Sequence, residues 1–134
     1  MRLVSLSVLS VSLLWGCGAE SSISSGRTGT TANGLYSVTY RPSPDPIPFA
    51  ELFDLHVTVS EMSGAPAKNA TLGIKVTMPA HGHGMQTSPQ VSSEGEGKFT
   101  VSGMKFHMRG TWQLAFTVEG SAGVDAVTLP ETFE

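Results

Sequence analysis

The chain has 134 residues, a formal net charge of −3 and only 14% charged residues. This composition provides no basic face, so we expect no nucleic-acid partner. The single cysteine excludes an intramolecular disulfide, and the folded part must depend on its hydrophobic core for stability.

The N-terminus has the pattern of a secretory signal. Arg2 is followed by an apolar run over residues 3–14, interrupted only by serines, and then by Leu-Trp-Gly-Cys at residues 14–17. Such a pattern is typical of a signal peptide rather than a membrane span. Its ending resembles a bacterial lipobox, which implies that residues 1–16 are removed and that Cys17 carries lipid. The alternative is an ordinary signal peptide with an incidental cysteine, but Cys17 is the only cysteine in the chain.

A lipid on Cys17 would anchor the mature protein to a membrane without spanning it. Gly18 follows the cysteine, where an aspartate would indicate retention at the inner membrane. We therefore expect a protein of the bacterial cell envelope, held at the outer membrane and facing the periplasm. Residues 17–34 are rich in Ser, Gly, Thr and Ala and predict a flexible linker. Residues 35–134 then form one domain of about one hundred residues.

Apolar and polar residues alternate through the expected domain, which is the period of strands. Clusters of glycine and proline interrupt this pattern, and no segment after the signal shows helical periodicity longer than a turn. Many short strands with such turns predict an all-β fold, an immunoglobulin-like antiparallel β-sandwich. The expected strands are residues 36–40, 53–59, 72–78, 85–91, 99–108, 112–118 and 124–129.

The hydrophobic pattern also predicts a register for the hairpin around residue 110. A two-residue loop at residues 109–110 places Phe106 and Trp112 on opposite faces, whereas a three-residue loop at residues 109–111 places them on the same face. Because a one-residue slip reverses every side chain, the pattern favours the three-residue loop. We therefore expect Trp112 to be buried beside Phe106 and His107 to face outward.

The most distinctive motif is Met-Pro-Ala-His-Gly-His-Gly-Met at residues 78–85. Glycine lets the backbone curl, so His81, His83 and Met85 could converge on one point. They are also two residues apart, which places them on one side of a regular strand. Imidazole and thioether suit copper, especially Cu(I), better than magnesium or calcium. We expect a copper ion to be bound by these three side chains, with His107 as a candidate fourth ligand.

Other interpretations of this motif remain open. Two histidines with a further nitrogen or carboxylate ligand would make an open zinc site, and the nearest acids are Glu94 and Glu96. Gly-rich turns with histidine are also common between strands, and buried methionine usually fills core. The domain would then be an accessory module that docks on an envelope or membrane complex.

We expect that the chain is not an enzyme. Its only cysteine is the expected lipidation site, which would leave no thiol nucleophile, and no serine lies in a Gly-x-Ser-x-Gly motif.

Several motifs occur together along this chain: Met-Pro at residues 78–79, Gly-His-Gly at residues 82–84, and Met104-x-Phe106-x-Met108-x-Gly110-x-Trp112-x-Leu114. Together they resemble the YtkA-like domain of bacterial envelope proteins, which is similar to FixH-type proteins. The resemblance covers roughly residues 36–118. It implies a small β-sandwich without established catalytic residues, in a context of metal handling or oxidase assembly. A protein partner in one of these processes is therefore expected.

The lipid anchor gives the first testable prediction. Cys17→Ser removes the only thiol that can accept lipid, so the variant should remain an unprocessed precursor or be released from membranes. Detergent partitioning and intact mass measure both results. An unmodified Cys17 in the mature wild-type protein would contradict the prediction.

Overall fold

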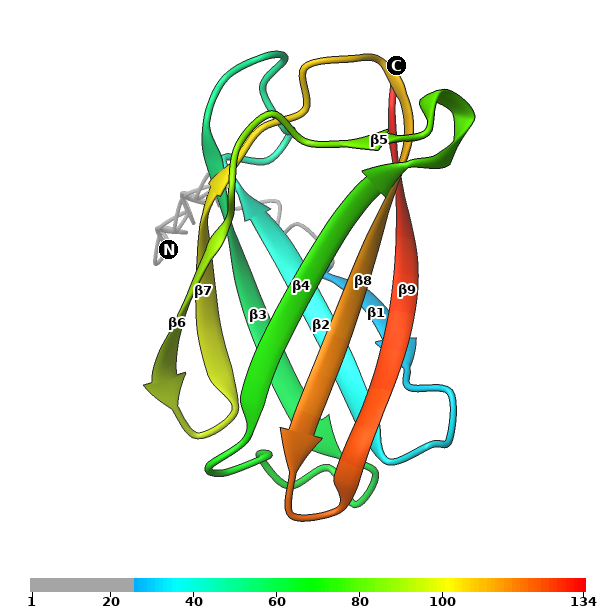
Figure 1. Cartoon of the computed structure of the whole chain (residues 1–134). Helices are drawn as coiled ribbons and strands as arrows, with labels where there is room; N and C mark the ends of the chain where they lie inside the picture. The colour runs from blue at the N-terminus through cyan, green and yellow to red at the C-terminus, as the bar shows by residue number, and fades with distance from the viewer. Residues whose placement is uncertain (1–25) are drawn as a thin grey trace, which may run out of the picture.

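The structure is a computed structural model that describes residues 26–134 (Figure 1). Two antiparallel sheets pack face to face, with the strand orders β1-β2-β3-β7-β6 and β5-β4-β8-β9. The predicted all-β sandwich is confirmed. Its strands are β1 Arg27–Thr30, β2 Tyr36–Ser43, β3 Phe53–Glu61, β4 Thr71–Met78, β5 His83–Gly84, β6 Gln90–Gly95, β7 Lys98–Met104, β8 Gly110–Gly120 and β9 Gly123–Phe133.

The core lies between the two sheets and takes alternate residues from each strand, because successive side chains of a strand point to opposite faces. Burial of these apolar groups is the main favourable contribution to folding. The largest fully buried side chains are aromatic: Trp112, Tyr36, Tyr40, Phe106 and Phe116. Within residues 26–134, no helix is both long enough and apolar enough to cross a membrane.

Strands β7 and β8 do not form the predicted hairpin. β7 pairs with β3 and β6 in one sheet, whereas β8 pairs with β4 and β9 in the other. Residues 105–109 therefore cross the end of the sandwich, as the yellow-orange connection near the top of Figure 1 shows. The predicted three-residue loop is therefore wrong. The burial pattern did not reveal this, because a strand buries the same alternate residues whether it pairs with its neighbour in a hairpin or faces it from the other sheet.

The predicted contact between Phe106 and Trp112 is nevertheless confirmed. Both side chains are fully buried, and their rings stack with centroids 5.0 Å apart and an interplanar angle of 6°. The indole Nε1–H of Trp112 donates to the carbonyl oxygen of Met108 at 3.0 Å. The crossing segment is thus fixed to β8 by both ring stacking and a hydrogen bond.

Strand β1 lies inside residues 17–34, which were expected to be a flexible linker. It pairs with β2 from Arg27 opposite Tyr40 to Thr30 opposite Ser37. The linker prediction is therefore wrong for residues 27–34, where backbone pairing orders a sequence with few apolar groups. Residues 1–25, which include the expected signal peptide and Cys17, lie outside the described residues.

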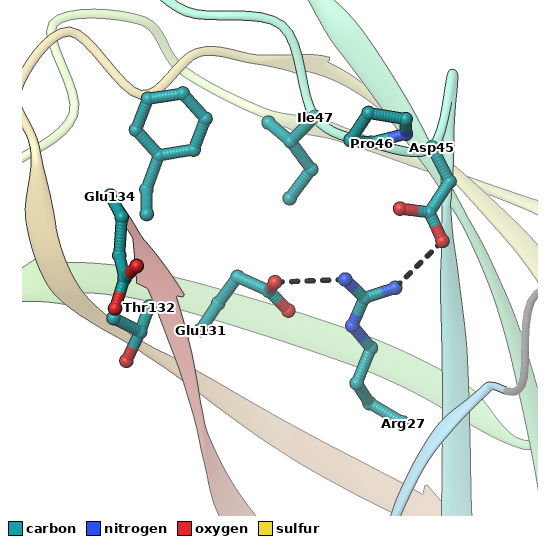
Figure 2. Close-up of a pocket in the computed structure, with 8 residues that line it drawn as sticks. Arg27, Asp45, Pro46, Ile47, Glu131, Thr132 and Glu134 are labelled. Carbon is teal, nitrogen blue, oxygen red and sulfur yellow. Dashed lines mark hydrogen bonds and ion pairs between the residues drawn. The ribbon is translucent and has the colours of Figure 1, made fainter.

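Arg27 connects β1 to the second sheet. Its guanidinium donates to Asp45 at 3.0 Å and to Glu131 of β9 at 2.9 Å (Figure 2). Glu131 also accepts a hydrogen bond of 2.6 Å from the hydroxyl of Tyr40. Burial and this hydrogen bond raise the pKa of Tyr40, which keeps the hydroxyl a donor. These side chains link the two sheets along one side of the sandwich. A hollow of about 350 Å³ lies beside them, and its lining includes Arg27, Asp45 and Glu131, which are paired with one another.

The carboxylate of Asp125 in β9 holds the turn after β1. It accepts backbone hydrogen bonds from Asn33 at 3.0 Å, Leu35 at 3.3 Å and Ala126 at 2.9 Å. Burial acts to raise the pKa of Asp125, but these hydrogen bonds and the hydroxyl of Thr31 outweigh it and lower the pKa to about 2.

Trp112→Ala tests the packing of the core. Truncation of a fully buried tryptophan should lower the free energy of unfolding by roughly 3–5 kcal/mol, because it leaves a large cavity against Phe106. Denaturant unfolding measures this loss. The exposed Val124→Ala is the control and should change stability by less than about 0.5 kcal/mol. A similar effect of the two substitutions would contradict the burial of Trp112.

Asp125→Asn tests the turn after β1 through its pH dependence. The folded-state pKa of Asp125, about 2, is lower than the unfolded value of about 3.9. Its carboxylate therefore stabilises the fold fully above about pH 4, and this contribution is lost as the pH falls towards about 2. The variant should have a lower Tm than the wild type at neutral pH, and the difference should shrink in acid. A difference that does not change with pH would contradict this role, and the exposed Glu119→Gln serves as control.

Candidate functional site

The histidine motif forms a tight hairpin at one end of the sandwich. β4 ends at Met78, a turn of 3₁₀ helix spans Pro79–His81, and β5 returns so that His83 lies opposite Met78. Gly82 joins the turn to β5 with φ of 65°, a left-handed conformation that favours glycine. The motif therefore reverses direction and does not continue as a regular strand, so strand parity does not decide where its side chains point.

The hairpin nevertheless brings the predicted histidines together. His81 is exposed on the turn, whereas His83 and His107 are half-buried. The ring centroids of His81 and His83 are 5.8 Å apart, and those of His83 and His107 are 5.4 Å apart. The rings stack with interplanar angles of 27° and 29°. Three imidazoles from two distant parts of the sequence thus form one row.

His107 does not face outward, as the predicted hairpin required. It lies on the crossing segment, packs against His83 and meets the edge of Trp112 with a centroid distance of 5.4 Å. Its Nδ1 atom is buried and has no hydrogen-bond partner among the described residues. A buried polar atom without a partner costs free energy, so packing and hydrogen bonding among the described residues leave this nitrogen unsatisfied.

Met85 approaches the same end of the sandwich after β5. Its side chain is half-buried against the core, and its sulfur accepts a 3.5 Å hydrogen bond from the backbone N–H of Lys105. Lys105 is two residues before His107 on the crossing segment. The thioether therefore lies beside the segment that carries the unpartnered imidazole.

The sequence does not predict two neighbours of these candidate ligands as site residues. Met78 lies opposite His83, and the pairing of Thr77 with Gln113 brings Met78 beside Trp112. The inner face of the second sheet therefore carries three neighbouring side chains on β5, β4 and β8, in the order His83, Met78 and Trp112. Met78 is part of the sequence motif, but only the pairing of strands shows that it faces the same side as His83.

The comparison with known families is consistent with this architecture. A family model described as YtkA-like matches residues 36–117, from the start of β2 into β8. The chain belongs to the YtkA-like family. The matched region includes both the histidine hairpin and the crossing segment, and the resemblance expected from the sequence motifs is confirmed. No curated protein and no solved structure matches the chain.

The geometry limits which ligands this YtkA-like domain can offer to a metal ion. Within residues 26–134, no three side chains of His, Cys, Asp or Glu are grouped so that they could hold one ion. Nδ1 of His83 lies 2.9 Å from the carbonyl oxygen of Gly84, so it carries the proton and leaves Nε2 as the free lone pair. The donors that the described residues offer at this end are therefore imidazole nitrogen and thioether sulfur.

The fourth histidine of the chain is not part of this group. His56 is exposed on β3 in the other sheet, as its position among polar residues indicated. It lines a shallow hollow with Thr39, Arg41 and Thr58 on the outer face of that sheet. His56 is therefore a useful control for substitutions in the hairpin.

Proposed function

We propose that this YtkA-like protein is an envelope lipoprotein that binds a copper ion and carries or delivers it. The observation that supports this function best is the gathering of His83, His107 and Met85 at one end of the sandwich, where Nδ1 of His107 is buried without a partner. This nitrogen needs a ligand or a proton acceptor that the described residues do not supply.

The donor atoms fit a soft ion. Cu(I) is well matched by imidazole and thioether, and it accepts few ligands. Nε2 of His83, Nδ1 of His107 and the sulfur of Met85 are the candidate inner ligands. His81 stacks on His83 but is exposed, which suits a residue that first captures the ion at the rim of the site.

The cellular setting extends this proposal. The lipobox-like sequence before Cys17 supports a lipid anchor, and Gly18 supports outer-membrane placement facing the periplasm. Membership of the YtkA-like family supports an envelope role. The expected partner is a protein that receives the ion in metal delivery or oxidase assembly.

A second candidate function is docking on an envelope or membrane complex without a metal ion. It is favoured by Phe49 and Leu52, which are 46% and 66% exposed on the connection between β2 and β3. This connection contacts the crossing segment through a hydrogen bond from Ala50 N to Phe106 O of 3.0 Å. Docking accounts for the exposed apolar side chains but not for the unpartnered nitrogen of His107.

Copper titration of the mature protein, purified without a histidine tag, tests the proposed function. In competition with a Cu(I) chelator, the wild type should bind one ion, and His81→Ala combined with His83→Ala should lower the affinity by at least about tenfold. Met85→Leu should weaken Cu(I) more than Cu(II), because it removes a soft sulfur ligand.

His56→Ala is the matched control, since it removes an exposed histidine from the other sheet. Its copper affinity should equal that of the wild type. If the double variant and the His56→Ala control bind copper equally well, the proposed site is wrong and the docking function is favoured.

A further inference from the structure

The ligands proposed above come from β5, from the residue that follows it and from the crossing segment. His83 and His107 supply two nitrogens and Met85 supplies one sulfur, while His81 is exposed at the rim. No carboxylate or thiolate joins them into a metal-binding group within residues 26–134. A further soft donor would have to lie beside His83 and face the same side of the sheet.

Met78 occupies the required position. It lies directly opposite His83 in the hairpin, and side chains in such cross-strand pairs have Cβ atoms roughly 4.5–5.5 Å apart. On the other side of β4, the pairing with β8 places Trp112 beside Met78. The ring of Trp112 packs against both His83 and His107. Met78 therefore lies on the same face of the second sheet as His83, next to the indole ring that His107 also contacts.

The end of the Met78 side chain is located by Gly110. A Cβ atom added at Gly110 would lie 2.5 Å from the terminal methyl group of Met78, so this methyl group reaches the first residue of β8. Gly110 directly follows the crossing segment, which carries His107 three residues earlier. The thioether therefore extends from β4 to the base of the segment that holds the unpartnered nitrogen.

We infer that Met78 is a buried thioether ligand of the copper site and that the site selects a soft monovalent cation, Cu(I) or Ag(I), over Zn(II). This inference rests on the proposed function and adds a ligand and an ion class to it. The set then contains two imidazoles and two thioethers, a combination that favours Cu(I).

Burial favours the monovalent ion for a second reason. Met78 is 1% exposed, and Trp112 and Phe106 are fully buried, so the floor of the site is apolar. All four ligands are neutral, and none offsets the charge of the ion. A divalent ion costs more to desolvate in such surroundings than a monovalent ion.

The test uses the mature protein with Ag(I) as a redox-inert probe, Cu(I) and Zn(II). With ¹³C-methyl-labelled methionine, one equivalent of Ag(I) should shift the NMR signals of Met78 and Met85 but not that of the fully buried Met104. This readout needs no substitution in the core. Ag(I) and Cu(I) should bind at least about a hundredfold more tightly than Zn(II), because thioether ligands select soft ions.

Met78→Leu is the matching variant, because leucine conserves volume and apolar character. It should lower the affinity for Ag(I) and Cu(I) by at least about tenfold, as loss of a metal contact does, and leave that for Zn(II) unchanged. Met104→Leu removes an equally buried thioether from β7 in the other sheet and should leave all three affinities unchanged. Equal losses for Zn(II) and Cu(I) would show that Met78 acts through packing alone and would overturn the inference.

The outcomes also separate this inference from the proposed function. If the wild type binds Cu(I) and His83→Ala abolishes binding, but the Met78 signal and the affinity of Met78→Leu do not change, the inference is overturned and the function stands. If the wild type binds neither Cu(I) nor Ag(I), both are overturned. If Zn(II) binds as tightly as Ag(I), the proposed selectivity is overturned.

Discussion

The arrangement of the site depends on the crossing of residues 105–109 between the two sheets. Because β7 and β8 belong to opposite sheets, the chain must pass over the open end of the core. Phe106 anchors this passage by stacking on Trp112, and the indole N–H binds the carbonyl oxygen of Met108. An aromatic stack of this kind contributes beyond simple area burial. His107 lies between these two anchors and is thereby held over the edge of the core.

This placement gives the histidines an unusual environment for a loop. The rings of His83 and His107 both contact Trp112, while the exposed ring of His81 stacks on His83. The site therefore passes from solvent at the rim to the apolar core within a few side chains. Such a gradient agrees with the proposed copper site, in which the ion is captured with its water at the rim and then held by soft ligands away from solvent.

Charged groups provide order where apolar groups are scarce. Strand β1 has a polar sequence, and it is held by pairing with β2 and by the contacts of Arg27 with Asp45 and Glu131. Asp125 binds the turn that follows. Periodicity and hydrophobicity cannot reveal this strand, because it is held by main-chain pairing with β2 and by an ion pair with Glu131, 104 positions away in the sequence. The same reasoning explains why a linker was expected there.

The sequence by itself determined the fold class, the inward side of the central strands and the family, because alternation and the Met-Pro and Gly-His motifs are local properties of the chain. It also predicts His81, His83 and Met85 as candidate metal ligands, with His107 as a candidate fourth. Only the tertiary structure decided that β8 pairs with β4 and β9, that His107 turns inward and that Met78 faces His83. Hydrophobic alternation predicts which side of a strand is buried, but the pairing partner of each strand depends on packing over the whole core.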